Sequence, residues 1–227
     1  MGTILSTENI IKQYRQYDHV VTAVNRVNFS VEDNEFVAII GSSGSGKSTF
    51  LHICAGLDFA DSGTVNIRGN DITKMDENAL SRFRGEYIGF VFQQHQLIEG
   101  FTALENILIP AVMCGREDFK YSEHIKKLID ILEISDRLHH LPSELSGGQQ
   151  QKIAIARAMI NRPQILLADE PTGNLDRRSA DNVLDLLINT KTSFKQTLVI
   201  VTHDLEIASR ADKVYKMENG ELFRHRM

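Results

Sequence analysis

The sequence predicts an α/β fold in which a mostly helical segment interrupts a core of strands and helices. Two observations carry this prediction. Four runs of apolar residues show no alternation, which is typical of strands covered on both faces, and they lie at 36–40, 88–92, 165–168 and 198–201. Between the second and third runs, residues from about 94 to 160 carry helical patterns instead.

Capping and periodicity mark the helices of that segment. Thr102 and Glu105 have the spacing of a capping box, and so do Ser146 and Gln149; in this motif the two side chains satisfy free backbone N–H groups at a helix start. Helical spacing also places four apolar residues on one face: Ile125, Leu128, Ile129 and Leu132. We predict a single domain over 1–227 with a helical subdomain inserted at approximately 94–160.

Strand patterns occupy both ends of the chain. Residues 1–35 predict short strands, and 64–68 predict a further strand that ends in a turn. The dipeptide Asn219-Gly220 predicts a hairpin turn between two short strands near the C-terminus.

The composition excludes some classes of function. With 25 Lys and Arg against 30 Asp and Glu, the net charge of −5 gives no basic excess for gripping nucleic acid, so no nucleic-acid partner is expected. No apolar run reaches the roughly 18 residues that a membrane span needs. Cys54 and Cys114 both sit in apolar sequence, which favours buried thiols and a reducing, cytosolic compartment.

Four predicted strands end in groups that bind phosphate, metal or water. The residues after these strands are Gly41, Gln93, the Asp169-Glu170 pair and His203. In open α/β sheets the ligand lies outside the carboxyl ends of the strands. These groups are therefore expected to line one crevice.

A glycine-rich phosphate loop follows the first of these strands. Its glycines let backbone N–H groups surround phosphates, Lys47 reaches the β- and γ-phosphates, and the Ser48 hydroxyl is a ligand for Mg²⁺. The predicted nucleotide-binding residues are Gly41, Ser42, Ser43, Gly44, Ser45, Gly46, Lys47, Ser48 and Thr49. The alternative is a flexible Gly/Ser turn.

The acid pair after the third strand complements this loop. Asp169 is the natural carboxylate for Mg²⁺, and Glu170 is placed to polarise the attacking water as a general base. The alternative is a salt-bridged acid pair. His203 alone is a weak signal, because a single histidine is more often structural than catalytic.

The segment Leu145-Ser146-Gly147-Gly148-Gln149 resembles the signature motif of ABC-transporter ATP-binding subunits. The resemblance covers essentially the whole chain. It implies a phosphate-loop (RecA-like) core with an N-terminal antiparallel β subdomain, and ATP and Mg²⁺ as cofactors. It also implies that Gln93 is the glutamine that touches Mg²⁺ and faces the membrane partner, with Gln94 and Gln96 as alternatives.

Further roles follow from the same resemblance. Asp176 lies in a segment like the D-loop, and His203 resembles the histidine that contacts the γ-phosphate. Tyr14 resembles the aromatic residue that stacks on adenine, with a core tyrosine as the alternative. Ser146, Gly147, Gly148 and Gln149 would face ATP held by a second copy of the chain, so ATP binding is expected to produce a homodimer.

The sequences of these motifs resemble those of the ABC branch that serves macrolide and antimicrobial-peptide exporters and lipoprotein release. Ser42 and Lys152 depart from that branch, which often has Pro and Arg there. The resemblance implies an ATPase at the cytoplasmic face of the cell membrane, attached through a separate integral-membrane permease. Two alternatives remain: a non-transporting regulatory ATPase of a cell-division or sensor complex, and a soluble ABC ATPase.

Overall fold

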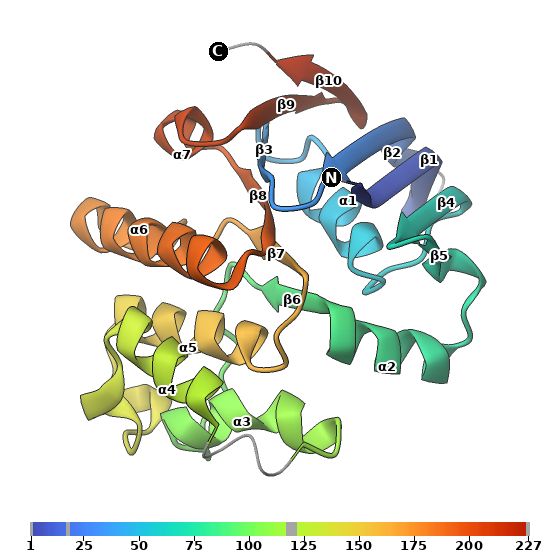
Figure 1. Ribbon diagram of the computed structural model, residues 1–227. Helices are drawn as coiled ribbons and strands as arrows, with labels where there is room; N and C mark the ends of the chain where they lie inside the picture. The colour runs from blue at the N-terminus through green and yellow to red at the C-terminus, as the bar shows by residue number, and fades with distance from the viewer. Residues whose placement is uncertain (1, 17–18, 117–121, 226–227) are drawn as a thin grey trace. The chain divides into compact units, whose positions relative to one another are not determined.

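The computed structural model describes residues 2–16, 19–116 and 122–225 (Figure 1). The chain divides into two compact units. The first contains Met1–Arg84 and Thr197–Met227, and the second contains Gly85–Gln196.

An antiparallel sheet forms the N-terminal part of the first unit. Its strand order is β2-β1-β4-β5, with β1 at Thr3–Gln16, β2 at His19–Glu32, β4 at Ser62–Ile67 and β5 at Asn70–Asp71. The expected short strands over 1–35 are in fact two strands of 14 residues each. The register of this pair shifts between Thr7 and Ile10, and Asn9 and Arg26 have φ 50°. Such irregularities interrupt the alternation of side chains, and the sequence therefore resembles shorter strands.

Parallel strands form the rest of this unit. β3 (Phe36–Ile40) pairs in parallel with both β8 (Thr197–Thr202) and β9 (Lys213–Glu218). The predicted hairpin joins β9 to β10 (Glu221–His225), with Asn219 and Gly220 at φ 49° and 81°. Every residue of β3 and β8 is buried, as their unalternating apolar sequences predict. The remaining elements here are α1 (Lys47–Cys54), η1 (Ile72–Lys74), α7 (Leu205–Ser209) and most of α2 (Glu77–Tyr87), whose last residues are assigned to the second unit.

The second unit combines two parallel strands with helices. Its elements are β6 (Ile88–Val91), α3 (Ala103–Met113), α4 (Glu123–Leu132), η3 (Ser135–Arg137), η4 (Pro142–Glu144), α5 (Gly147–Met159), β7 (Ile165–Asp169) and α6 (Arg177–Phe194). Helix α5 packs against α3 and α6, and α4 packs against both α5 and α6. Both predicted capping boxes are present, at the starts of α3 and α5.

The two cysteines differ in burial. Cys54 is buried in α1, as expected, but Cys114 is exposed. The expectation for Cys114 was wrong because this residue caps the C-terminus of α3, beyond its last buried residue, Ala111. Within the described part of the chain, no helix combines the length and the apolar character that crossing a membrane requires.

Candidate functional site

At two positions, the loop between β3 and α1 passes too close to other backbone for a side chain. Gly46 has φ 104°, and a Cβ on it would lie 2.0 Å from the carbonyl oxygen of Ala23. A Cβ on Gly41 would lie 2.4 Å from the carbonyl oxygen of Met217. Glycine is therefore required at both positions.

Lys47 is a buried cation at the start of α1. The residue is 6% exposed, and its Nζ donates to the carbonyl oxygens of Gly41 and Ser42 at 2.8 and 2.9 Å. No carboxylate of the described residues lies within salt-bridge distance of this ammonium group. Because a buried charge without a counter-charge is costly, this position fits a polyanion. The buried hydroxyl of Ser45 has no hydrogen-bond partner among the described residues.

His203 leaves the sheet beside this loop. Ile40 of β3 is the register partner of Thr202 of β8, so the next residues, Gly41 and His203, follow at the same edge. His203 is exposed, and the Thr202 hydroxyl accepts from the backbone N–H of Asp204 at 3.0 Å. Within the first unit, the structure thus brings together two of the residues predicted for one crevice.

Tyr14 is half-exposed, with 42% of its surface accessible, so it is not a core tyrosine. Its hydroxyl donates to Asp58 at 2.7 Å, and Lys12 forms a 2.8 Å ion pair with the same carboxylate. Burial raises the pKa of Tyr14, and the bond to Asp58 raises it further. Burial alone would raise the pKa of Asp58, but hydrogen bonds from Lys12 and Tyr14 hold it below its ordinary value. The ring is fixed at its hydroxyl end, with the Lys12 ammonium 5.1 Å from its centroid.

The acid pair ends β7 in the second unit. Val91 of β6 is the register partner of Ala168 of β7, so Gln93 and the Asp169-Glu170 pair follow at one edge. Asp169 is buried at 6% exposure, whereas Glu170 is partly exposed and has φ 45°. A left-handed backbone is uncommon outside glycine and turns the chain sharply after the strand.

Gln93 lies beside Glu170. A Cβ built on Gly173 would lie 3.5 Å from both Gln93 Nε2 and Glu170 Cβ, so Gly173 separates the two side chains. Asn174 Nδ2 donates to the Gln93 carbonyl oxygen at 3.1 Å. Gln96 instead lines a different cavity, described below. This placement favours Gln93 over Gln96 as the glutamine near the acid pair.

Asp176 begins helix α6. Its carboxylate accepts from the Ser179 backbone N–H at 3.1 Å, and bonds from Ser179 lower the pKa of this exposed group. The structure thus gives Asp176 a local capping contact.

The signature residues begin helix α5. Ser146 accepts from Gln149 N at 3.4 Å, and Gln149 Oε1 accepts from Ser146 N at 2.9 Å. Beside them lies a cavity of ≈ 240 Å³ lined by Ser146, Gly148, Gln149, Lys152, Arg178, Ser179, Asn182 and Val183. A capped helix start with two nearby cations favours anions. Sequence reasoning missed Arg178, because nothing in the sequence pattern brings the start of α6 beside the start of α5.

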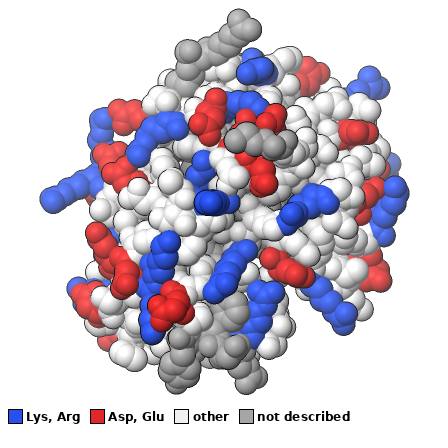
Figure 2. All heavy atoms as spheres, in the orientation of Figure 1, with Lys and Arg blue, Asp and Glu red and all other residues white. Residues whose placement is uncertain are grey.

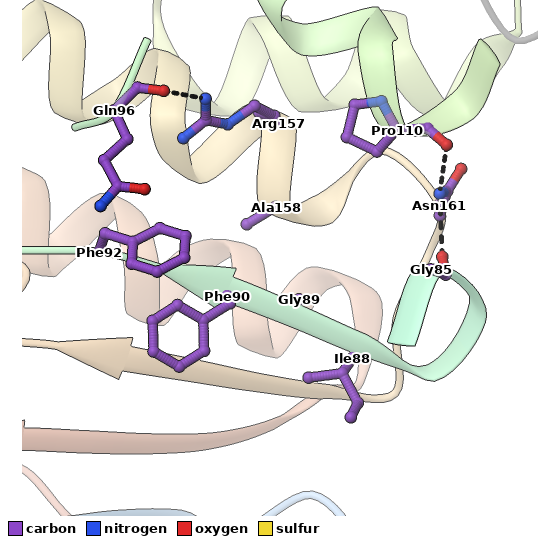
Figure 3. Close-up of a pocket in the computed structure, with 10 residues that line it drawn as sticks. All are labelled: Gly85, Ile88, Gly89, Phe90, Phe92, Gln96, Pro110, Arg157, Ala158 and Asn161. Carbon is purple, nitrogen blue, oxygen red and sulfur yellow. Dashed lines mark hydrogen bonds between the residues drawn. The ribbon is translucent and has the colours of Figure 1, made fainter. Parts of the chain in front are cut away.

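A second cavity of ≈ 240 Å³ lies along β6 (Figure 3). Its lining is Gly85, Ile88, Gly89, Phe90, Phe92, Gln96, Pro110, Arg157, Ala158 and Asn161. The rings of Phe90 and Phe92 lie 4.5 Å apart between centroids. The sequence predicts Ile88, Phe90 and Phe92 only as part of an apolar core strand. Their spacing of two residues, which puts side chains of a strand on one face, is the signal that could have indicated a shared wall.

Two further observations concern the side chains that could bind a metal ion and the charge on the surface. Among the described residues, no group of three or more His, Cys, Asp or Glu side chains is arranged to hold a metal ion. On the face drawn in Figure 2, basic and acidic side chains are interspersed.

Comparisons with known proteins show the family to which the chain is related. The ABC transporter family profile matches residues 24–173. The lipoprotein-releasing system ATP-binding protein LolD of Treponema denticola is 42% identical over 219 residues, covering 96% of this chain and 97% of LolD. An uncharacterized ABC transporter ATP-binding protein, YbbA of Escherichia coli K12, is also 42% identical, with 96% of each chain covered.

Solved structures show the same relationship. The dimeric structure of MJ0796, a bacterial ABC transporter cassette, matches with a TM-score of 0.89 and 35% identity, covering 98% of this chain and 99% of that one. A post-hydrolysis dimer of MJ0796 bound to ADP and Pi matches with a TM-score of 0.87 and 34% identity, with the same coverage. With its signature sequence and its phosphate loop, the chain belongs to the ABC transporter family as one of its ATP-binding ATPase subunits.

Proposed function

We propose that this protein binds Mg-ATP on residues 41–49, forms an ATP-dependent homodimer, and drives a membrane permease that extracts lipoproteins. The observation that carries the nucleotide site is Lys47, a buried ammonium group held by two loop carbonyls at the start of a helix. A triphosphate supplies the counter-charge that this position lacks, and α1 adds the positive potential of its N-terminus.

The metal would be held by oxygen ligands from this chain together with phosphate oxygens. Ser48, Gln93 and Asp169 offer a hydroxyl, an amide and a carboxylate, which are ligands suited to Mg²⁺. Asp169 supports this assignment because its carboxylate is largely buried at the end of β7. When bound, Mg²⁺ neutralises charge on the phosphates.

Glu170 is the proposed general base. Its side chain lies beside Gly173 and Gln93, at the end of a fully buried strand that fixes its position. Its carboxylate accepts a proton from the water that attacks the γ-phosphate. His203 is proposed to contact the γ-phosphate, since it leaves β8 next to the loop. Tyr14 is proposed to stack on adenine with its exposed ring.

The second half of each site comes from the partner copy. Ser146, Gly147, Gly148 and Gln149 present a helix start, and the adjoining cavity carries Lys152 and Arg178. An anionic γ-phosphate held by the other copy fits this environment. Asp176 is proposed to lie at the same junction, from its resemblance to the D-loop.

Lipoproteins are the preferred cargo because several relatives at 42–43% identity over nearly their full length are named for lipoprotein release. Export of macrolides or antimicrobial peptides, or regulation without transport, remain the competing functions. In each case, we propose, the protein works at the cytoplasmic face of the membrane. The segment at about 94–160 forms its helical subdomain and meets the permease there.

The test is reconstitution. The chain is co-purified with the membrane protein encoded beside it and placed in proteoliposomes that contain an acylated lipoprotein. ATP-dependent release of that lipoprotein, abolished by Glu170→Gln, supports the proposed cargo. ATPase activity without release, but with stimulation by a peptide or a macrolide, would replace it with the corresponding export function.

A further inference from the structure

The chain after β6 is irregular and depends on side chains from elsewhere in the second unit. Residues 92–102 belong to no helix or strand. An irregular backbone does not satisfy its own carbonyl groups. Arg157 of α5 supplies two donors: Nη1 donates to the Gln96 carbonyl oxygen at 2.6 Å, and Nη2 donates to that of His95 at 2.7 Å. Figure 3 shows the first of these bonds.

A second contact joins the same segment to the same helix. His95 Nδ1 donates to Gln151 Oε1. Gln151 is fully buried, and its Nε2 has no hydrogen-bond partner among the described residues. The bond to His95 is therefore the one side-chain hydrogen bond that the described structure gives Gln151.

These contacts resist separation for an electrostatic reason. Arg157 has no carboxylate within salt-bridge distance among the described residues, so its charge is compensated by the two carbonyl dipoles. Withdrawing the segment would leave a partly buried guanidinium group without these two acceptors, which costs more than losing a neutral hydrogen bond.

The contacts also lie directly between two parts of the proposed site. His95 follows Gln93 by two residues, and Gln151 follows Ser146 by five on one helix. A Cβ built on Gly147 would lie 4.0 Å from His95 Nε2. The histidine ring therefore lies next to the first signature residues.

We propose that His95, Gln151 and Arg157 form a latch that makes the Gln93 segment and the start of helix α5 move together. These three are positioning residues. They fix the place of the signature residues relative to Gln93, the glutamine proposed to contact the metal and face the permease. The inference rests on the proposed roles of Gln93 and Ser146, and it assigns a task to three residues outside the nucleotide site.

The test is a double-mutant cycle in the Glu170→Gln background. The dimer dissociation constant is measured with saturating Mg-ATP by analytical ultracentrifugation for His95→Ala, Gln151→Ala and the pair. Each single change should weaken the dimer by about three- to tenfold, and the pair should weaken it no further, because both remove the same bond. His95→Asn should restore the dimer, since its Nδ2 replaces the donor. His139→Ala, at an exposed histidine of the same unit, is the matched control.

A second measurement separates positioning from loss of folding. With Glu170 intact, Gln151→Ala should raise the Mg²⁺ concentration for half-maximal ATPase activity, although Gln151 touches no proposed metal ligand; a general loss of folded protein would lower only the maximal rate. Single variants that dimerise like the His139→Ala control, or effects that multiply in the pair, would overturn the latch. Failure of the Glu170→Gln parent to dimerise would instead reject the proposed two-copy site.

Discussion

Ile40 and Thr202 are register partners in the parallel strands β3 and β8, so Gly41 and His203 leave the sheet side by side. The same relationship recurs in the second unit, where Val91 and Ala168 deliver Gln93 and the acid pair to one edge. The sheet fixes these strand ends. The pairing of the strands, and not contact between side chains, therefore determines where these functional residues leave the sheet.

Lys47→Ala should lower ATP affinity by about 10- to 100-fold, because it removes charge-assisted hydrogen bonds to phosphate at a buried position. Isothermal titration calorimetry with ATP measures this. Lys74→Ala, at an exposed lysine paired with Asp71, is the control and should bind like wild type. Equal affinities for the two variants would show that Lys47 is not the phosphate lysine.

Glu170→Gln should slow hydrolysis by about 10²- to 10⁴-fold while ATP still binds, because an amide cannot accept the proton. Trapped ATP should then hold the homodimer together, and size-exclusion chromatography should show a dimer with Mg-ATP and a monomer without it. Adding Gly148→Asp should abolish that dimer by placing a carboxylate against the γ-phosphate. A variant that stays monomeric at all ATP concentrations would contradict the two-copy site.

Two glycines of the phosphate loop should differ sharply in their tolerance of alanine. Gly44 has φ 78° with open space around its Cβ position, so Gly44→Ala should cost only about 1–2 kcal/mol of backbone strain. Gly46→Ala adds a Cβ 2.0 Å from the Ala23 carbonyl oxygen and should distort the loop. Thermal unfolding and ATP titration of both variants measure the difference. Equal losses of stability and ATP affinity in the two variants would show that the loop accommodates the Cβ at position 46 without extra cost.

His124 should make the protein less stable in mild acid. Burial lowers the pKa of this histidine, whose Nε2 donates to the Met159 carbonyl oxygen at 3.0 Å. Well above pH 6.5, the ring is neutral in both the folded and the unfolded state. As pH falls below that value, the unfolded state takes up its proton first, so the free energy of unfolding falls by at most about 1.4 kcal/mol per pH unit.

Urea titrations between pH 7.5 and 5 test this prediction. His124→Gln should flatten the pH dependence in that range, whereas His139→Ala, at an exposed site, should retain it. If the His124→Gln profile stays parallel to that of wild type, another group causes the acid sensitivity.

The sequence predicted most of the buried strands and helix starts because their signals are local. Unalternating apolar runs became β3, β7 and β8, and both capping boxes formed with their expected partners. It failed where the signal depends on distant residues. Bulges concealed the length of β1 and β2, and the exposure of Cys114 depends on where α3 ends.

The candidate site divides in the same way. Motif spacing selected Lys47, Asp169 and Glu170 as candidates. It could not reveal that Arg157 donates to the carbonyl oxygens of residues 95 and 96, because no pattern relates positions 62 and 61 residues apart. The cavity along β6 could not be predicted for the same reason: its lining comes from β6, α3 and α5, which lie far apart in the sequence.

Gln93→Ala should uncouple hydrolysis from the permease. Gln93 lies beside Glu170 across Gly173, and its carbonyl oxygen accepts from Asn174, so it is held next to the proposed base at the start of the irregular segment. Because water can replace one metal contact, ATP affinity should stay within about threefold of wild type. A change of that size corresponds to the net free energy of one neutral hydrogen bond. Stimulation of turnover by the co-purified membrane subunit in lipid should be largely lost.

Gln94→Ala, at the adjacent exposed glutamine, is the matched control and should keep full stimulation. A polar substitution at exposed Phe101 should abolish pull-down of the permease without changing the ATPase rate of the isolated subunit. Equal stimulation of wild type and Gln93→Ala would remove the coupling role from this glutamine, and loss of stimulation in Gln94→Ala alone would transfer that role to its neighbour.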